Sequence, residues 1–195
     1  MTALPPPCAF GLRVKSGWAA VVLLAGPRHA PRVIDRRVLE LSDPDVPHSR
    51  QPYHAGFGTA QLDTIAIDRL IRGIERFARK RVAALVEMTR QEHRIKGAGI
   101  VVPSLTDPAT ISSPHMRAHA SEGRLFRIVS AESLERSRVK TEVILERDVY
   151  DHLAKQLHSS VVRVKQRVET LGEAVRPWRA EQKVAAAAAW LILAR

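Results

Sequence analysis

A short polar segment near the middle of the chain holds the densest set of side chains able to bind a metal ion. It reads His-Met-Arg-Ala-His-Ala-Ser-Glu and places His115, His119 and Glu122 at positions i, i+4 and i+7. On a helix these positions share one face. Two imidazoles and a carboxylate suit zinc or manganese, so the spacing predicts a divalent metal site or a catalytic site. The alternative is a polar helix surface or a hydrogen-bonded packing contact, and Met116 stands where the zinc-peptidase motif has its glutamate.

A second candidate site lies near the N-terminus, in the segment Gly-Leu-Arg-Val-Lys-Ser-Gly. Arg13 and Lys15, with the backbone N–H groups of Ser16 and Gly17, could form a positive concavity that binds phosphate. The alternation of these two cations with apolar residues is also typical of the exposed face of a strand. The sequence leaves both interpretations open.

The charge points to the same class of ligand. The chain has 195 residues and a formal net charge of +11, with arginine much more frequent than lysine. Because arginine makes planar, bidentate contacts with phosphates, nucleic acid is the first charged partner to consider. The alternative is an arginine-rich proteome, in which GC-rich coding places arginine on any solvated face.

Two features bear on the compartment. The single cysteine, Cys8, excludes an intramolecular disulfide and a cysteine zinc cluster, so a reducing compartment is expected. The first residues lack the pattern of a signal peptide, and the longest apolar run, Val184 to Ala194, is far shorter than the roughly 20 residues that a membrane span needs. We therefore expect a cytoplasmic protein with no membrane association.

Hydrophobic periodicity predicts three strands followed by a mixture of helices and strands. Residues 1–8 are expected to form a flexible lead and residues 9–195 a single domain. The strands are expected at 9–14, 19–24, 32–41, 98–102 and 140–145. The helices are expected at 59–93, 115–134, 147–157 and 177–194, while 161–171 could be a helix or a strand. Residues 42–58, rich in proline and glycine, are expected to lack regular structure.

This order of elements resembles that of the ribonuclease H-like superfamily, which includes the Holliday-junction resolvases and the actin-like ATPases. The opening Gly-Leu-Arg-Val-Lys-Ser resembles the Gly-Ile-Asp-x-Gly-Ser opening of the resolvases. The segment from Trp178 to Lys183 resembles the start of their last helix, which carries the final catalytic acids. The resemblance implies an α/β domain with a ribonuclease H-like mixed sheet and flanking helices.

The resemblance also implies two-metal cleavage of phosphodiesters, but the expected carboxylates are missing. The first-strand aspartate of the family falls on Arg13, and the acid after the fourth strand falls among Val102, Pro103 and Ser104. Glu181 is the only acid at a comparable place on the last helix. Since two-metal cleavage needs clustered carboxylates, the usual resolvase site is absent.

Two classes of function remain. The leading prediction is a non-catalytic binding or scaffold protein of this fold, with nucleic acid or a protein as its partner. The alternative is a metal-dependent nuclease or hydrolase whose site has moved to His115, His119 and Glu122, with a contribution from Glu181.

Overall fold

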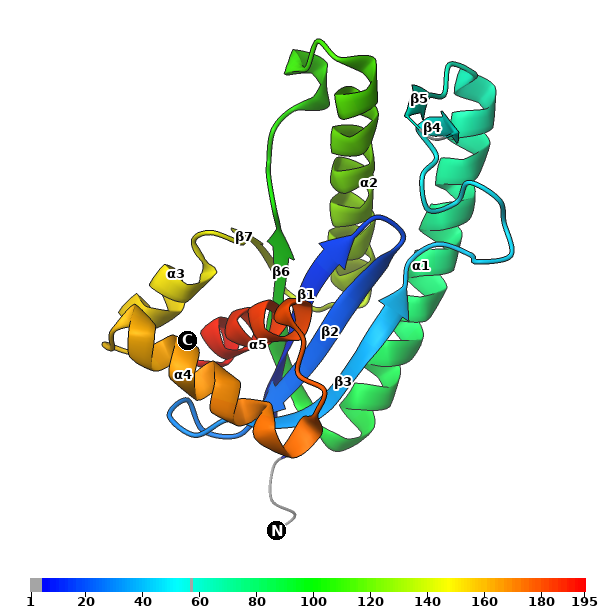
Figure 1. Ribbon diagram of the computed structural model, residues 1–195. Helices are drawn as coiled ribbons and strands as arrows, with labels where there is room; N and C mark the ends of the chain where they lie inside the picture. The colour runs from blue at the N-terminus through cyan, green and yellow to red at the C-terminus, as the bar shows by residue number, and fades with distance from the viewer. Residues whose placement is uncertain (1–4, 57) are drawn as a thin grey trace.

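The computed structural model describes residues 5–56 and 58–195 and is built around a mixed sheet with the strand order β3-β2-β1-β6-β7 (Figure 1). These strands are β1 (Pro7–Lys15), β2 (Trp18–Ala25), β3 (Arg32–Glu40), β6 (Arg94–Val102) and β7 (Thr141–Leu145). The pairs β1–β2 and β2–β3 are antiparallel, whereas β6 pairs in parallel with both β1 and β7. The C-terminal ends of β1, β6 and β7 therefore meet at one edge of the sheet, where α/β folds commonly bind their ligands.

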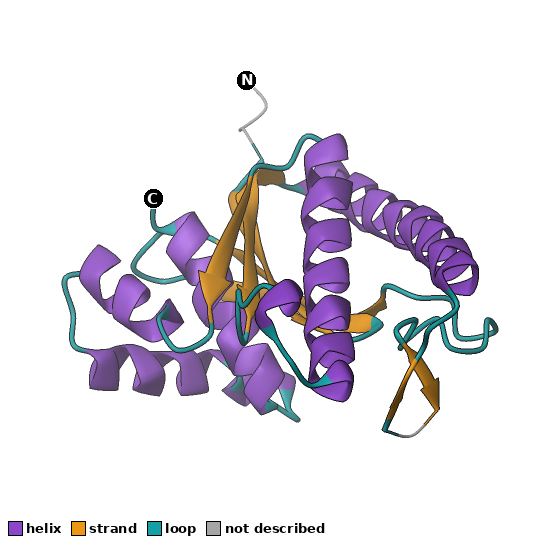
Figure 2. Cartoon of the chain, turned by 90° about the horizontal axis from the view of Figure 1, so that it is seen from above, coloured by secondary structure: helices purple, strands orange, loops and turns teal. Residues whose placement is uncertain are grey.

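Helices cover both faces of this sheet (Figure 2). They are α1 (Thr64–Glu92), α2 (Pro114–Arg136), α3 (Val149–Gln156), α4 (Val161–Leu171) and α5 (Ala180–Leu193). Alternate residues of β1 point to opposite faces, so Phe10 and Leu12 pack with α1 and α2, while Ala9 packs with α3, α4 and α5. Two hydrophobic layers therefore hold the sheet, and the N-terminal parts of α1 and α2 project beyond its edge (Figure 1).

The last helix, α5, lies very close to the sheet, because the residues at the contact are a run of buried alanines. A Cβ atom added at Gly11 would lie 1.7 Å from the carbonyl oxygen of Ala185, so only glycine fits on β1 at this crossing. The indole N–H of Trp178 donates to the carbonyl of Val168 at 3.0 Å, and that of Trp190 donates to the carbonyl of Arg28 at 2.7 Å. Both tryptophans are buried, so they fill gaps around α5 and offer no stacking platform for bases.

Three local predictions are corrected. Residues 42–58 contain regular structure, because the short strands β4 (His54–Gly56) and β5 (Thr59–Ala60) pair with each other. Thr59 is therefore a strand residue, and α1 is capped instead by Asp63, whose side chain accepts the N–H of Ala66 at 3.0 Å. The strand predicted at 98–102 begins four residues earlier, at Arg94, so Gly97 lies inside β6, where a Cβ would come within 2.9 Å of the carbonyl oxygen of Lys140.

The remaining boundaries follow the periodicity closely. The ambiguous segment 161–171 is the helix α4, whose N-cap Ser160 accepts the N–H of Arg163. The strand β1 begins at Pro7, within the predicted lead, and residues 1–4 of that lead lie outside the described residues. Among the described residues, no helix is both long and apolar enough to cross a membrane.

Candidate functional site

Two adjoining pockets are lined in part by α2, and the smaller one lies at the edge of the sheet where β1 and β6 end. The larger pocket, of about 690 Å³, lies between the loop 44–51 and the side chains of His54, His115 and His119. The smaller pocket, of about 290 Å³, lies between the ends of β1 and β6 and the middle of α2. His119 lines both pockets, so the two predicted sites are neighbours.

Helix α2 presents His115, His119 and Glu122 on one face, as their spacing predicts. The side chain of Ser113 caps this helix by accepting the N–H of Met116, and Pro114 occupies the first turn, where its missing N–H costs nothing. His115 thus lies in the first turn, and Glu122 follows two turns later within the buried face of the helix.

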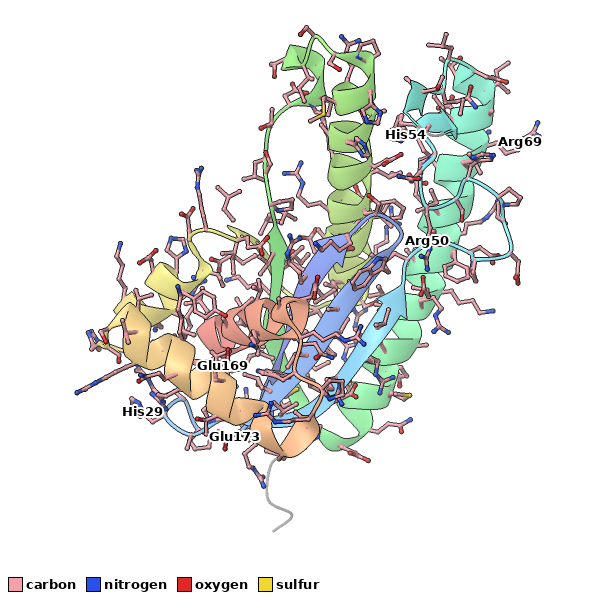
Figure 3. The ribbon with its side chains drawn as sticks, viewed as in Figure 1. His29, Arg50, His54, Arg69, Glu169 and Glu173 are labelled. Atoms are coloured by element: carbon pink, nitrogen blue, oxygen red, sulfur yellow. The ribbon has the colours of Figure 1, made fainter. Side chains whose placement is uncertain are left out.

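A third histidine that the spacing did not reveal completes the cluster. His54 belongs to β4, which places its ring against α2 (Figure 3). Its Nε2 atom lies 3.3 Å from Nδ1 of His115, while Nε2 of His119 lies 3.2 Å from Nε2 of His115. One ring nitrogen from each histidine can be chosen so that all three lie within 4.8 Å of one another. We call His54, His115 and His119 the histidine cluster.

Glu122 stands behind the histidine cluster and has no access to solvent. Its Oε1 atom lies 2.7 Å from Nδ1 of His54, while Oε2 has no hydrogen-bond partner among the described residues and lies 3.9 Å from Nδ1 of His119. Burial raises the pKa of Glu122 above its ordinary value, and the hydrogen bond and charge of His54 offset only part of this rise. When Glu122 is ionised, its free buried oxygen is stabilised by a nearby positive charge, which the cluster can supply through a proton or a metal ion.

The electrostatics of the histidine cluster favour a neutral His119. Burial, and then the charges of His54 and His115, lower the pKa of His119 below its ordinary value. The side chain is nonetheless 46% exposed, so its lone pair can reach a ligand that enters from solvent. Neutral imidazole is the form of histidine that binds metal ions.

The smaller pocket contains Arg13, which does not lie on an exposed strand face. Its side chain is only 5% exposed and pairs with Glu146, which follows the end of β7. A second N–H of the same guanidinium donates to the carbonyl of Val14 at 2.8 Å. The charge of Arg13 is therefore already balanced within the protein.

The other polar side chains of the smaller pocket are less constrained than Arg13. The cation Lys15 and the hydroxyl of Ser16 line it from the end of β1, and the cations Arg124 and Arg127 line it from α2. Arg124 pairs with Asp107 at 3.3 Å, but both side chains are more than half exposed, so this pair is weak. The structure thus brings Arg13, Lys15 and Ser16 together in one pocket wall.

Two predicted site residues lie elsewhere. Gly17 does not line the smaller pocket; its carbonyl instead accepts the N–H of Leu41 at 2.8 Å and the N–H of Ser42 at 3.1 Å, which fixes the loop after β3. Glu181 lies in the first turn of α5 and lines neither pocket.

The two-metal centre of the ribonuclease H-like superfamily does not fit this site. At the end of β1, where that centre needs a carboxylate, the buried Arg13 guanidinium pairs with Glu146. A cation at this position repels divalent ions, and among the described residues no carboxylate lines the smaller pocket. The position that the resemblance assigns to the first-strand aspartate is thus held by an arginine whose charge is paired within the protein.

No protein-family model and no curated protein sequence matches the chain. Among solved structures, Thermus thermophilus RuvC is similar, with a TM-score of 0.54, 13% sequence identity, and coverage of 94% of this chain and 91% of RuvC. T. thermophilus RuvC in complex with a Holliday junction substrate gives the same TM-score and identity and covers 94% and 90%.

The yeast mitochondrial Holliday junction resolvase Ydc2 matches with a TM-score of 0.46 and 9% identity, covering 98% of this chain and 79% of Ydc2. The likeness to RuvC extends over nearly the whole of both chains and includes the mixed sheet with helices on both faces. The chain therefore has the ribonuclease H-like fold.

Proposed function

We propose that this protein binds the phosphate backbone of nucleic acid in the smaller pocket and does not cleave it by two-metal chemistry. The observation that carries the proposal is the pairing of buried Arg13 with the partly exposed Glu146, at the position where the resemblance implies a metal-binding carboxylate. Glu146 balances the charge of Arg13, so the attraction for phosphate comes from the other cations that line the pocket, Lys15, Arg124 and Arg127.

The chemistry of the pocket wall suits a phosphodiester. Lys15 lines the pocket from the end of β1 and Arg127 lines it from α2, and arginine can hold two phosphate oxygens at once. Ser104 and Thr106, whose hydroxyl oxygens lie 2.7 Å apart, line the pocket and add hydrogen-bond donors. These contacts would be independent of base sequence, because phosphate contacts position a protein without reading bases.

The neighbouring fold indicates which nucleic acid to test first. One RuvC structure was solved with a Holliday junction substrate, so four-way junctions, duplexes and single strands form the natural comparison. The net charge of +11 adds a general attraction to any of them.

The test compares two charge-matched double variants. Lys15→Ala with Arg127→Ala removes two pocket cations, whereas Lys155→Ala with Arg163→Ala removes two exposed cations from α3 and α4. Titrating labelled junction and duplex at about 50 and 200 mM salt should show that the pocket variant loses about 1.8 from the slope of log K against log salt, or about 0.9 for each duplex phosphate contact. Identical slopes for the two double variants would exclude the smaller pocket.

The non-catalytic part of the proposal has its own test. Incubation of the wild-type protein with the same substrates in Mg²⁺ and in Mn²⁺ should leave every strand intact. Cleavage that disappears in Glu146→Gln or in Glu181→Ala would show that a carboxylate site operates and would contradict the proposal.

A second candidate function is metal-dependent hydrolysis at the histidine cluster. It is favoured by the convergence of His54 with His115 and His119 directly beside the smaller pocket. This function predicts cleavage of nucleic acid or a phosphodiester model compound in Zn²⁺ or Mn²⁺, lost in His115→Ala with His119→Ala and retained in His152→Ala.

A further inference from the structure

We propose that His54, His115 and His119 bind a single zinc ion, that Glu122 positions His54 without contacting the metal, and that the fourth coordination position opens into the larger pocket. This proposal does not depend on nucleic-acid binding, since it concerns ligands other than the cations of the smaller pocket. It also changes the ligand set that the sequence predicts, in which Glu122 would itself bind the metal.

The spacing of the three rings fits a tetrahedral ion. With Zn–N distances of about 2.0–2.1 Å, two nitrogens on one tetrahedron lie about 3.3–3.4 Å apart. One nitrogen from each ring can be chosen so that all three lie within 4.8 Å of one another. The 3.3 Å contact with His54 uses Nδ1 of His115 and the 3.2 Å contact with His119 uses Nε2, so a single ion takes one of these two nitrogens and the third ring must turn toward it.

Glu122 gives His54 the hydrogen-bonded carboxylate partner that metal-binding histidines commonly have. When its carboxylate is ionised, Oε1 accepts the Nδ1–H of His54 at 2.7 Å. His54 then carries its lone pair on Nε2, which is the nitrogen that faces His115. A carboxylate that fixes the tautomer of a ligating histidine in this way raises its basicity.

The burial of Glu122 supports the same conclusion. Its Oε2 atom is buried without a hydrogen-bond partner among the described residues, and the side chain has no access to water. A buried, half-satisfied carboxylate is costly unless a positive charge lies nearby. A divalent ion at the histidine cluster would supply that charge about one imidazole ring away.

The ligand types select the metal. Three imidazole nitrogens suit zinc, whereas Mg²⁺ and Ca²⁺ require oxygen ligands. The single cysteine lies buried in β1 within the hydrophobic layer under α1 and α2 and does not contribute a thiolate. Cobalt binds similar nitrogen sites and can therefore report on the geometry of the site.

The fourth position remains open because the three histidines lie at one wall of the larger pocket. The opposite wall is formed by the loop 44–51, which includes His48 and Arg50. Structural zinc sites have four protein ligands, whereas sites that bind water or a substrate have three and an open position. The geometry is of the second kind, so the occupant of the open position is water or an anionic or nitrogen-containing ligand that enters from this pocket.

The test starts from untagged protein, so that no added histidines bind metal. Dialysis against a chelator followed by titration with Zn²⁺, in competition with a chromophoric chelator, should give one ion per chain with a Kd below 1 μM, on the order of other protein zinc sites. Titration with Co²⁺ should produce the strong visible absorption of a tetrahedral ion.

Variants assign the ligands. His115→Ala with His119→Ala should weaken zinc binding at least about 100-fold, and both side chains lie where they can be removed without opening the core. Glu122→Gln should weaken it about 10- to 100-fold and shift the cobalt spectrum, as expected for a positioning residue. His152→Ala, on the exposed side of α3, is the matched control and should bind zinc as the wild type does.

Failure of the proposal is equally clear. Binding that is weaker than about 10 μM, or that is the same in the double variant and in the His152→Ala control, would overturn the site. Binding that survives in Glu122→Gln with an unchanged cobalt spectrum would overturn the role of Glu122. Neither outcome decides whether the pocket double variant loses salt dependence relative to its control, so the two proposals can fail separately.

Discussion

Removing the charge of Glu146 should make the protein less stable and, at the same time, a better binder of polyanions. The substitution Glu146→Gln keeps the shape of the side chain but leaves the guanidinium of Arg13 without its counter-charge. That guanidinium is only 5% exposed and retains one neutral partner, the carbonyl of Val14. It would therefore attract the next available anion, which is a phosphate in the smaller pocket.

The size of the stability loss follows from the geometry of the pair. Breaking a fully buried ion pair by removing one partner costs about 3–5 kcal/mol. The Glu146 side chain is 40% exposed, so water already screens part of this interaction. We expect a loss of about 1–3 kcal/mol in the free energy of unfolding.

The matched control is Glu142→Gln, which removes a glutamate of β7 that pairs with Arg195 at the surface. Because that arginine is 47% exposed, the control should lose less than about 1 kcal/mol. Urea unfolding measures both losses, with equal m-values as the sign that the native and unfolded states remain comparable.

The salt dependence of nucleic-acid binding is the second measurement on the same two variants. Glu146→Gln should steepen the slope of log K against log salt by about 0.9, the value of one additional phosphate contact, while Glu142→Gln should not change it. If Glu146→Gln costs no more stability than Glu142→Gln, and if the two slopes are equal, the assignment of Arg13 as a buried, compensated charge is refuted.

Two further predictions concern packing and alkaline pH. Gly11→Ala should destabilise the fold by about 3 kcal/mol or more, because its Cβ would meet the backbone of Ala185. Gly73→Ala, on the open side of α1, should instead stabilise the fold by about 0.5–1 kcal/mol. Urea unfolding measures both changes, and a Gly11→Ala variant as stable as the wild type would contradict the close approach of α5 to β1. Burial raises the pKa of the Cys8 thiol from 9.0 to about 11, so the folded state holds this proton more tightly than the unfolded state. The contribution of Cys8 to the free energy of unfolding should therefore be fully present below pH 9. It should fall by up to about 3 kcal/mol as the pH rises to 11. Cys8→Ala should lose this part of the pH dependence in thermal unfolding, and rapid labelling of native Cys8 by a thiol reagent at pH 8 would contradict its burial.

The sequence predicts most of this fold because most of its signals are local. The apolar runs of β1 and β2, and the cap and first turn of α2, lie within a few residues of the structures that they specify. The segment 161–171 was ambiguous for a physical reason, since its buried face consists of Val164 and Val168, and valine is common in both helices and strands.

The sequence predicts only the part of the candidate site that lies on one face of α2. The spacing of His115 and His119 predicts their approach, but His54 lies 61 positions earlier than His115 and approaches them only through the pairing of β4 with β5. A single histidine in a loop rich in proline and glycine carries no periodic signal. Glu146 did leave a signal, because an acid directly after a strand of a parallel pair lies at the edge where ligands bind.

The shared wall formed by His119 has a thermodynamic consequence. A divalent ion at the histidine cluster would add positive charge beside the smaller pocket, so occupancy of one site changes the free energy of filling the other. Such coupling is reciprocal: if zinc tightens the binding of a polyanion by some factor, the polyanion must tighten the binding of zinc by the same factor. A protein arranged in this way would report the availability of a metal as a change in its affinity for nucleic acid, with no movement of α2, which carries residues of both sites.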